Sequence, residues 1–123
     1  MSPVLRTKWD DVAKGDLIPE GRHLARIDKV EEKVSEKSGK SYWAVTYTLQ
    51  DEPYTGRQVW GNCSLEPRAL WKLRMLAESI GIDLTGRDDL DADELVNQEV
   101  GIVITHETYE GKERVRVDDF FKV

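Results

Sequence analysis

The chain has 123 residues, enough for one compact domain and too few for two domains with cores of their own. Its charged fraction is 34%, but four Trp, four Tyr and two Phe provide apolar area to bury, which argues against a disordered chain. The formal net charge of −6 counts against nucleic-acid binding if that charge is spread evenly. No apolar run approaches the roughly 18 residues of a membrane span, so we expect a cytoplasmic protein with no membrane contact.

The negative charge is concentrated in one segment. Residues 83–99 contain seven acidic residues against Arg87 alone, a balance of −6. The rest of the chain is therefore neutral, and nucleic-acid binding is no longer excluded. We interpret residues 83–99 as an acidic loop that lies away from any DNA groove. It either keeps the protein soluble or docks a basic partner such as a recombinase or a nuclease.

The N-terminal third predicts an arm followed by a long strand. Residues 1–20 contain two prolines and no sustained period, so we expect an arm anchored by Trp9, with residues 21–123 forming the single domain. Alternating apolar residues predict a strand over 21–33. The alternation slips by one residue before Val30, which is typical of a β-bulge. A polar turn with Gly39 follows.

Two further strands complete a predicted meander. Residues 42–50 alternate cleanly, and residues 57–64 resume the alternation after a turn at 51–56. The inward positions are Trp43, Val45, Tyr47 and Leu49 on the first strand and Val59, Gly61 and Cys63 on the second.

One helix and a hairpin are expected in the C-terminal half. Helical spacing predicts a helix over 66–80, with Ser64 as its N-cap and Gly81 as its end. The acidic loop carries one short helical turn around 92–96. Strands at 100–105 and 114–117 form a closing hairpin around the Glu110-Gly111 turn, and residues 118–121 end the last strand.

The order of elements is three strands, one helix and two strands. This is the order of the OB-fold, so we predict a mainly β protein: a five-stranded OB-fold-like barrel with one α-helix between strands 3 and 4. A split barrel and an antiparallel sheet packed on one helix fit the same order.

Several short motifs resemble a known family. They are Ile18-Pro19-Glu20-Gly21, Ser38-Gly39-Lys40, Tyr54-Thr-Gly-Arg57-Gln-Val-Trp60 and the helical residues 73–81. The chain resembles, over residues 10–123, a family of short proteins from the replication and recombination gene clusters of tailed bacteriophages. These proteins were long catalogued as of unknown function and are thought to be OB proteins that bind single-stranded DNA. The resemblance implies that role, in the cytoplasm of the host cell.

The predicted strands offer a surface for single-stranded DNA. OB barrels stack bases on aromatic side chains of strands 2 and 3 and hold phosphates with cations from flanking loops. The side chains that alternation or loop position assigns to this surface are Arg26, Lys37, Lys40, Tyr42, Thr46, Arg57, Trp60, Asn62, Lys112, Arg114 and Arg116. Two alternatives remain for these residues. Trp60 packs under the arm or the acidic loop, and Arg114 and Arg116 pair with Glu107 or Glu110 across the hairpin.

Nothing in the sequence predicts an enzyme, a cofactor or a metal. Residues 38–41 match the end of a phosphate-binding loop, but a hairpin surrounds them and the first glycine is missing. Cys63 is accompanied by no triad signature, so we expect a buried structural thiol. Our leading hypothesis is a protein that binds single-stranded DNA with little sequence preference. The alternative is an interaction module for a replication or recombination protein; either form is compatible with a homodimer.

Overall fold

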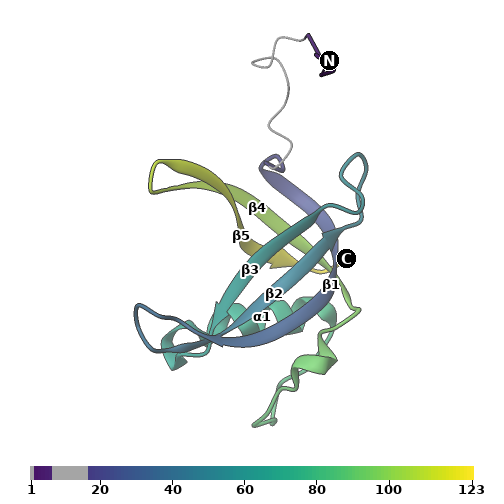
Figure 1. Cartoon of the computed structure of the whole chain (residues 1–123). Coiled ribbons are helices and arrows are strands. Elements are labelled where there is room, and N and C mark those ends of the chain that lie inside the picture. The colour runs from purple at the N-terminus through teal and green to yellow at the C-terminus, as the bar shows by residue number, and fades with distance from the viewer. Residues whose placement is uncertain (1, 7–16) are drawn as a thin grey trace.

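The computed structural model describes residues 2–6 and 17–123, and its main element is one five-stranded sheet (Figure 1). Trp9, the expected anchor of the arm, lies outside the described residues. Neighbouring strands are antiparallel, in the order β3-β2-β1-β4-β5. The strands are β1 (Gly21–Val34), β2 (Ser41–Leu49), β3 (Gln58–Ser64), β4 (Glu99–Tyr109) and β5 (Lys112–Phe121). The mainly β prediction is confirmed.

The sheet is open between its two edge strands. Because every neighbouring pair is antiparallel, β3 and β5 run in the same direction, yet no ladder joins them in the described part of the chain. They come close at Gly61, where an added Cβ would lie 3.3 Å from the Cβ of Val117. The described strands thus form a curved sheet and not a closed barrel.

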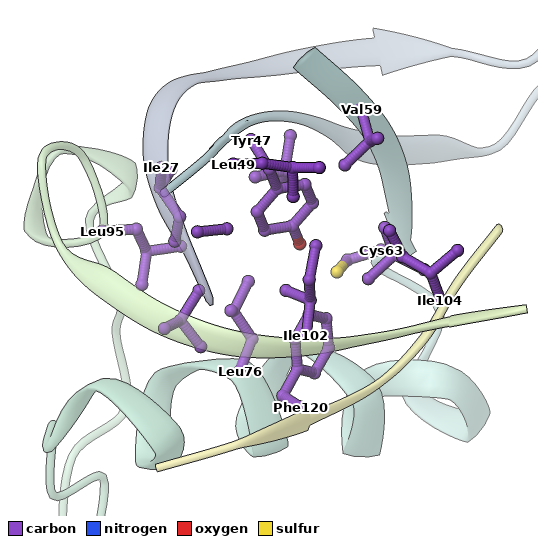
Figure 2. Close-up of a cluster of buried hydrophobic side chains, with 14 of the residues drawn as sticks. Ile27, Tyr47, Leu49, Val59, Cys63, Leu76, Leu95, Ile102, Ile104 and Phe120 are labelled. Carbon is purple, nitrogen blue, oxygen red and sulfur yellow. The ribbon is translucent and has the colours of Figure 1, made fainter. Parts of the chain in front are cut away.

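The predicted alternation on the central strands is confirmed. Val45, Tyr47, Leu49, Val59 and Cys63 are all buried, and Figure 2 shows the Tyr47 ring in the middle of the cluster. The helix α1 (Leu70–Ile80) adds Leu73, Leu76 and Ala77 to the same core. The inner face of the sheet therefore packs on α1, which leaves the outer face of β1, β2 and β3 available to solvent.

The β-bulge in the first strand is also confirmed. The β1–β2 register shifts between Ile27 and Lys29, so Asp28 leaves the regular ladder. Its carboxylate accepts a hydrogen bond from the Thr48 hydroxyl, which lowers the pKa of Asp28. The backbone of Ile27 instead bonds to the segment before β4, with its N–H donating to the Gln98 carbonyl at 2.9 Å.

The start of the helix differs from the prediction. The α-helix begins at Leu70, behind the 3-10 turn η2 (Pro67–Ala69), and its N-cap Ala69 makes no side-chain bond. Ser64 was expected to cap the helix; its Oγ instead accepts the N–H of Glu66 at 3.2 Å and so turns the chain out of β3. The predicted end is confirmed, because Gly81 adopts φ 103°.

The second 3-10 turn and the last hairpin agree with the sequence patterns. The turn η3 (Ala92–Glu94) lies in the acidic segment, and the side chain of Asp91 caps it. The β4–β5 strands are longer than predicted, and Glu110 and Gly111 turn between them with positive φ. In Figure 1 the segment after α1 lies at the end of the molecule away from this hairpin.

The last residues of the predicted arm are attached to the sheet. Ile18 is fully buried in the core. Its carbonyl lies 2.6 Å from the His106 Nε2, and the His106 backbone N–H donates to the Glu20 carboxylate at 2.8 Å. On the other side, the Pro19 carbonyl lies 2.8 Å from the His23 Nε2. Both histidines therefore serve to fix the chain before β1.

Candidate nucleic-acid interface

A groove of about 600 Å³ lies between the edges of β3 and β5. Both walls are strand edges without a ladder partner in the described residues, so backbone groups as well as side chains face it. Its lining residues are Leu17, Gln58, Val59, Trp60, Gly61, Asn62, Lys72, Glu107, Glu113, Arg114, Val115, Arg116 and Val117.

Trp60 is the largest exposed side chain on the β3 wall. Its side chain is 63% exposed, and its register neighbour across the β2–β3 ladder is Thr46. Asn62, two residues further along β3, is exposed on the same face. Tyr42 is half-buried on that face, opposite Ser64 at the far end of the ladder. An indole held by a strand and open to solvent is a platform on which a planar ring can stack.

Two arginines on the β5 wall share one carboxylate. Arg114 Nε donates to the Glu107 Oε1 at 2.7 Å, and Arg116 Nη1 lies 3.6 Å from the Glu107 Oε2. Arg116 also reaches Asp118, with Nε 3.4 Å from Oδ1. The pairing with Glu107 that the sequence left open is thus present. All three side chains are partly exposed, so these pairs are weak and can exchange partners.

The β1–β2 turn and the β4–β5 hairpin meet through a tyrosine that the sequence patterns did not predict. Lys37, in the β1–β2 turn, donates from Nζ to the Tyr109 hydroxyl at 2.7 Å, and this bond lowers the pKa of Tyr109. The Arg114 guanidinium lies 4.3 Å from the centre of the same ring. Tyr109 therefore stands between two cations, one from each hairpin. No sequence period predicts this contact, because it joins a turn to the end of a strand 72 residues away.

The other predicted cations are dispersed. Arg26 pairs with Asp28 at 3.1 Å on the outer face of β1, and Lys40 forms an ion pair with Glu66. Arg57 precedes β3, where its N–H donates to the Tyr54 carbonyl at 2.9 Å. Lys112 is exposed at the start of β5. Of the eleven predicted residues, the groove itself brings together Trp60, Asn62, Arg114 and Arg116.

The helix contributes a groove residue that the sequence did not indicate. Lys72 reaches from α1 to β5, where its Nζ donates to the Val117 carbonyl at 3.0 Å. The bond satisfies the carbonyl of the β5 residue that faces Gly61 of β3. The sequence does not indicate this role of Lys72, because lysines are common on the surfaces of helices.

The described residues hold no cluster of metal ligands, and their one cysteine is buried. In the ranges 2–6 and 17–123, no three His, Cys, Asp or Glu side chains come together as metal ligands. Cys63 is 1% exposed, and burial raises the pKa of its thiol, which keeps it protonated and out of reach. Of the helices that the structure describes, none has the length and apolar character needed to cross a membrane.

These features define a small antiparallel β protein with one helix and a groove between parallel strand edges. The chain belongs to the family described as "Protein of unknown function (DUF669)", whose model matches residues 6–122. A comparison with curated proteins finds no match.

Proposed function

We propose that this protein binds single-stranded DNA along the outer face of β2 and β3 and in the groove between β3 and β5. We further propose that its sheet is an OB-fold, a five-stranded barrel left open between those two strands. The observation that carries the proposal is the exposed indole of Trp60 in the same groove as Arg114 and Arg116. A stacking platform beside two cations is the combination that single strands require.

The chemistry of binding is an exchange of partners. A base stacks on Trp60, which contributes about 1–3 kcal/mol and tolerates any base. A phosphate then replaces the Glu107 carboxylate as the partner of Arg114 and Arg116. This exchange costs little free energy, because exposed ion pairs contribute only about 0–1 kcal/mol each. Little sequence preference follows, since neither step reads the edge of a base.

The proposed setting is replication or recombination in a tailed bacteriophage, with the protein in the cytoplasm of the host cell. The protein acts there without catalysis and without a cofactor. Its work is to cover bases and phosphates of single strands, with Tyr42, Thr46 and Asn62 extending the outer surface beside Trp60. Lys37 and Lys112 supply cations at the hairpin turns, while Arg26, Lys40 and Arg57 extend that track only after giving up their present contacts.

A second candidate function is an interaction module for a replication or recombination protein. The observation that favours it is the exposed Trp71 on α1, which is 61% exposed and borders an apolar hollow that shares no lining residue with the groove. The two functions use different faces, so one tryptophan substitution on each face separates them.

The test is a titration of fluorescent oligo-dT, with duplex DNA as competitor, at two salt concentrations. We expect binding to the single strand that weakens as salt rises, because phosphate contacts release counterions. Trp60→Ala should weaken it by about 1 kcal/mol or more, the loss of one stacked base. Trp71→Ala is the matched control, because its indole is equally exposed on another element.

Three results contradict the proposal. They are no binding of oligo-dT at low salt, affinity that does not depend on salt, and equal effects of the two tryptophan substitutions in variants whose circular dichroism shows a normal fold. The last result would favour the interaction module.

A further inference from the structure

One cation of the β3–β5 groove differs from the other two in what it contacts. The groove is lined by Lys72 on α1 and by Arg114 and Arg116 on β5. Arg114 Nε lies 2.7 Å from a carboxylate oxygen of Glu107. Arg116 Nε lies 3.4 Å from a carboxylate oxygen of Asp118. Lys72 forms no ion pair with any residue that the structure describes, so its charge alone is not matched there by a carboxylate.

The ammonium group of Lys72 lies between the two edge strands. Its Nζ donates to the Val117 carbonyl of β5 at 3.0 Å. It also acts on β3, since burial raises the pKa of the Cys63 thiol and the positive charge of Lys72 opposes that rise. The side chain comes from α1, which packs on the inner face of the sheet. Lys72 therefore occupies the floor of the groove, where Gly61 faces Val117.

This ammonium group retains hydrogen-bonding capacity for a further acceptor. A lysine ammonium has three N–H donors, and the Val117 carbonyl takes one of them. The Lys72 side chain is half-buried, and a charge that is partly removed from water without a counterion costs free energy. An anion that reaches this charge is attracted more strongly than at a fully exposed lysine, because the effective dielectric constant is lower. The floor of the groove thus suits one anionic group.

The β3 wall of the groove indicates which anion fits. Trp60 lies on the outer side of β3 with its indole 63% exposed, whereas Lys72 approaches the groove from the inner side. One residue offers a ring for stacking and the other a point charge for a phosphate. A nucleotide carries both complements, a planar base and a phosphate. An acidic side chain of a protein carries only the charge.

We propose that Lys72 binds one backbone phosphate of a single strand at the floor of the groove, with a neighbouring base on Trp60. This inference rests on the proposed function and adds an orientation to it: the phosphates point toward α1 and the bases toward the outer side of β3. The contact differs from those of Arg114 and Arg116, because it displaces no carboxylate. Lys72 therefore contributes more to affinity than either arginine.

The experiment is a titration of fluorescent oligo-dT at several salt concentrations, which gives the slope of log affinity against log salt. Each phosphate contact contributes about 0.7 to the size of that slope for a single strand. We expect Lys72→Gln to reduce the slope by about 0.7. Affinity at low salt should fall by about tenfold, the effect of losing one charge-assisted hydrogen bond. Lys72→Arg keeps the charge and should keep the slope of the wild-type protein.

Two comparisons separate the phosphate contact from other effects. Arg74→Gln is the matched control, because it removes an equal charge from the same helix at a residue outside the groove. It should leave the slope unchanged. Lys72→Gln retains an N–H donor for the Val117 carbonyl, and urea denaturation checks that its stability is preserved. Trp60→Ala should lower the affinity at an unchanged slope, since it removes a stacked base and no charge.

A strand without bases tests the orientation. On an abasic oligonucleotide of the same length, Lys72→Gln should still reduce the slope, because the phosphates remain. Trp60→Ala should have no effect on that ligand, because nothing is left to stack on the indole.

Four outcomes overturn the proposal while wild-type binding of oligo-dT leaves the proposed function standing. The first is a Lys72→Gln variant that weakens binding at the wild-type slope, the sign of a structural role. The second is an equal loss of slope in Arg74→Gln, which makes net charge responsible. The third is an abasic strand whose slope does not depend on Lys72. The fourth is a glutamate-rich peptide that binds through Lys72 as tightly as oligo-dT does. Failure of the wild-type protein to bind oligo-dT at low salt contradicts the proposed function itself, and this inference with it.

Discussion

The Nζ of Lys37 and the phenol oxygen of Tyr109 lie 2.7 Å apart, across 72 residues of sequence. This hydrogen bond joins the β1–β2 turn to the end of β4, so the β1–β2 and β4–β5 hairpins meet at one point.

The lysine gives Tyr109 a measurable signature. Because Lys37 donates to the hydroxyl oxygen, it lowers the pKa of Tyr109 below the ordinary value of 10.0. The part of its stabilisation that depends on pH therefore appears at alkaline pH: this part is complete above the unfolded pKa and is lost as pH falls through the folded pKa. Titration of the Tyr109 phenol by NMR should show a higher pKa in Lys37→Met. Lys112→Met is the control, since Lys112 pairs with Tyr109 in the ladder; an equal shift there would contradict the assignment.

Glu107 competes with phosphate for the arginines of the groove. In Glu107→Gln, Arg114 and Arg116 lose their shared carboxylate, so under the proposed function the affinity for oligo-dT should rise. Weak exposed pairs of about 0.2–1 kcal/mol correspond to a gain of about 1.4- to 5-fold. The same titration of Glu113→Gln provides the control, because it removes an equal charge from the same hairpin. If both variants gain equally, net charge and not local pairing is responsible.

One carboxyl group of the acidic segment, that of Glu94, should stay ionised at unusually low pH. Hydrogen bonds from Arg87 hold the pKa of Glu94 at about 2, against 4.5 for an ordinary glutamate. A lowered folded pKa means that the contribution to stability is complete above the unfolded pKa and is lost as pH falls through the folded pKa. The window thus runs from about 4.5 down to about 2. Carboxyl NMR should show the pKa of Glu94 rising in Arg87→Met and staying in place in Arg74→Met.

The segment before β1 should contribute to stability through one side chain. Ile18 is fully buried, so Ile18→Ala leaves a cavity and should cost about 2–5 kcal/mol of the free energy of unfolding. Urea denaturation measures the loss as a lower midpoint at an unchanged slope. Leu17→Ala, at a half-buried neighbour, should cost much less. A small effect of Ile18→Ala would show that residues 17–20 do not belong to the cooperative unit.

Periodicity predicted the parts of the fold that repeat. The alternation of Val45, Tyr47 and Leu49 identified the inner face, because a strand half-buried against a core must alternate. The slip before Val30 identified the bulge for the same reason. The prediction that Ser64 caps the helix was wrong. Its hydroxyl accepts the N–H of Glu66, and a serine in that role has the same sequence pattern as a helix N-cap. Ser64 does bond a nearby backbone N–H, but the 3-10 turn η2 lies between it and α1.

The candidate site was predictable only in part. Trp60 and Asn62 follow from the parity of β3, and the structure places them on one groove wall with Arg114 and Arg116 on the other. Lys72 was not predicted because it reaches the groove from the helix, and no period links the helix to β3. Tyr109 was not predicted because its contact joins the end of β4 to the β1–β2 turn. Whether a cation is paired also depends on a partner far along the chain, as with Lys40 and Glu66.

The position of the acidic segment has a consequence for how fast and in which orientation the molecule meets a partner. A neutral body with a negative end at the far side from the β4–β5 hairpin is an electric dipole (Figure 1). Near a polyanion such a dipole experiences a torque that turns the negative end outward before contact. The torque acts only within the Debye length, about 8 Å at physiological ionic strength. Under the proposed function, the β4–β5 hairpin therefore faces the nucleic acid on arrival, most strongly at low salt, where the Debye length is longer.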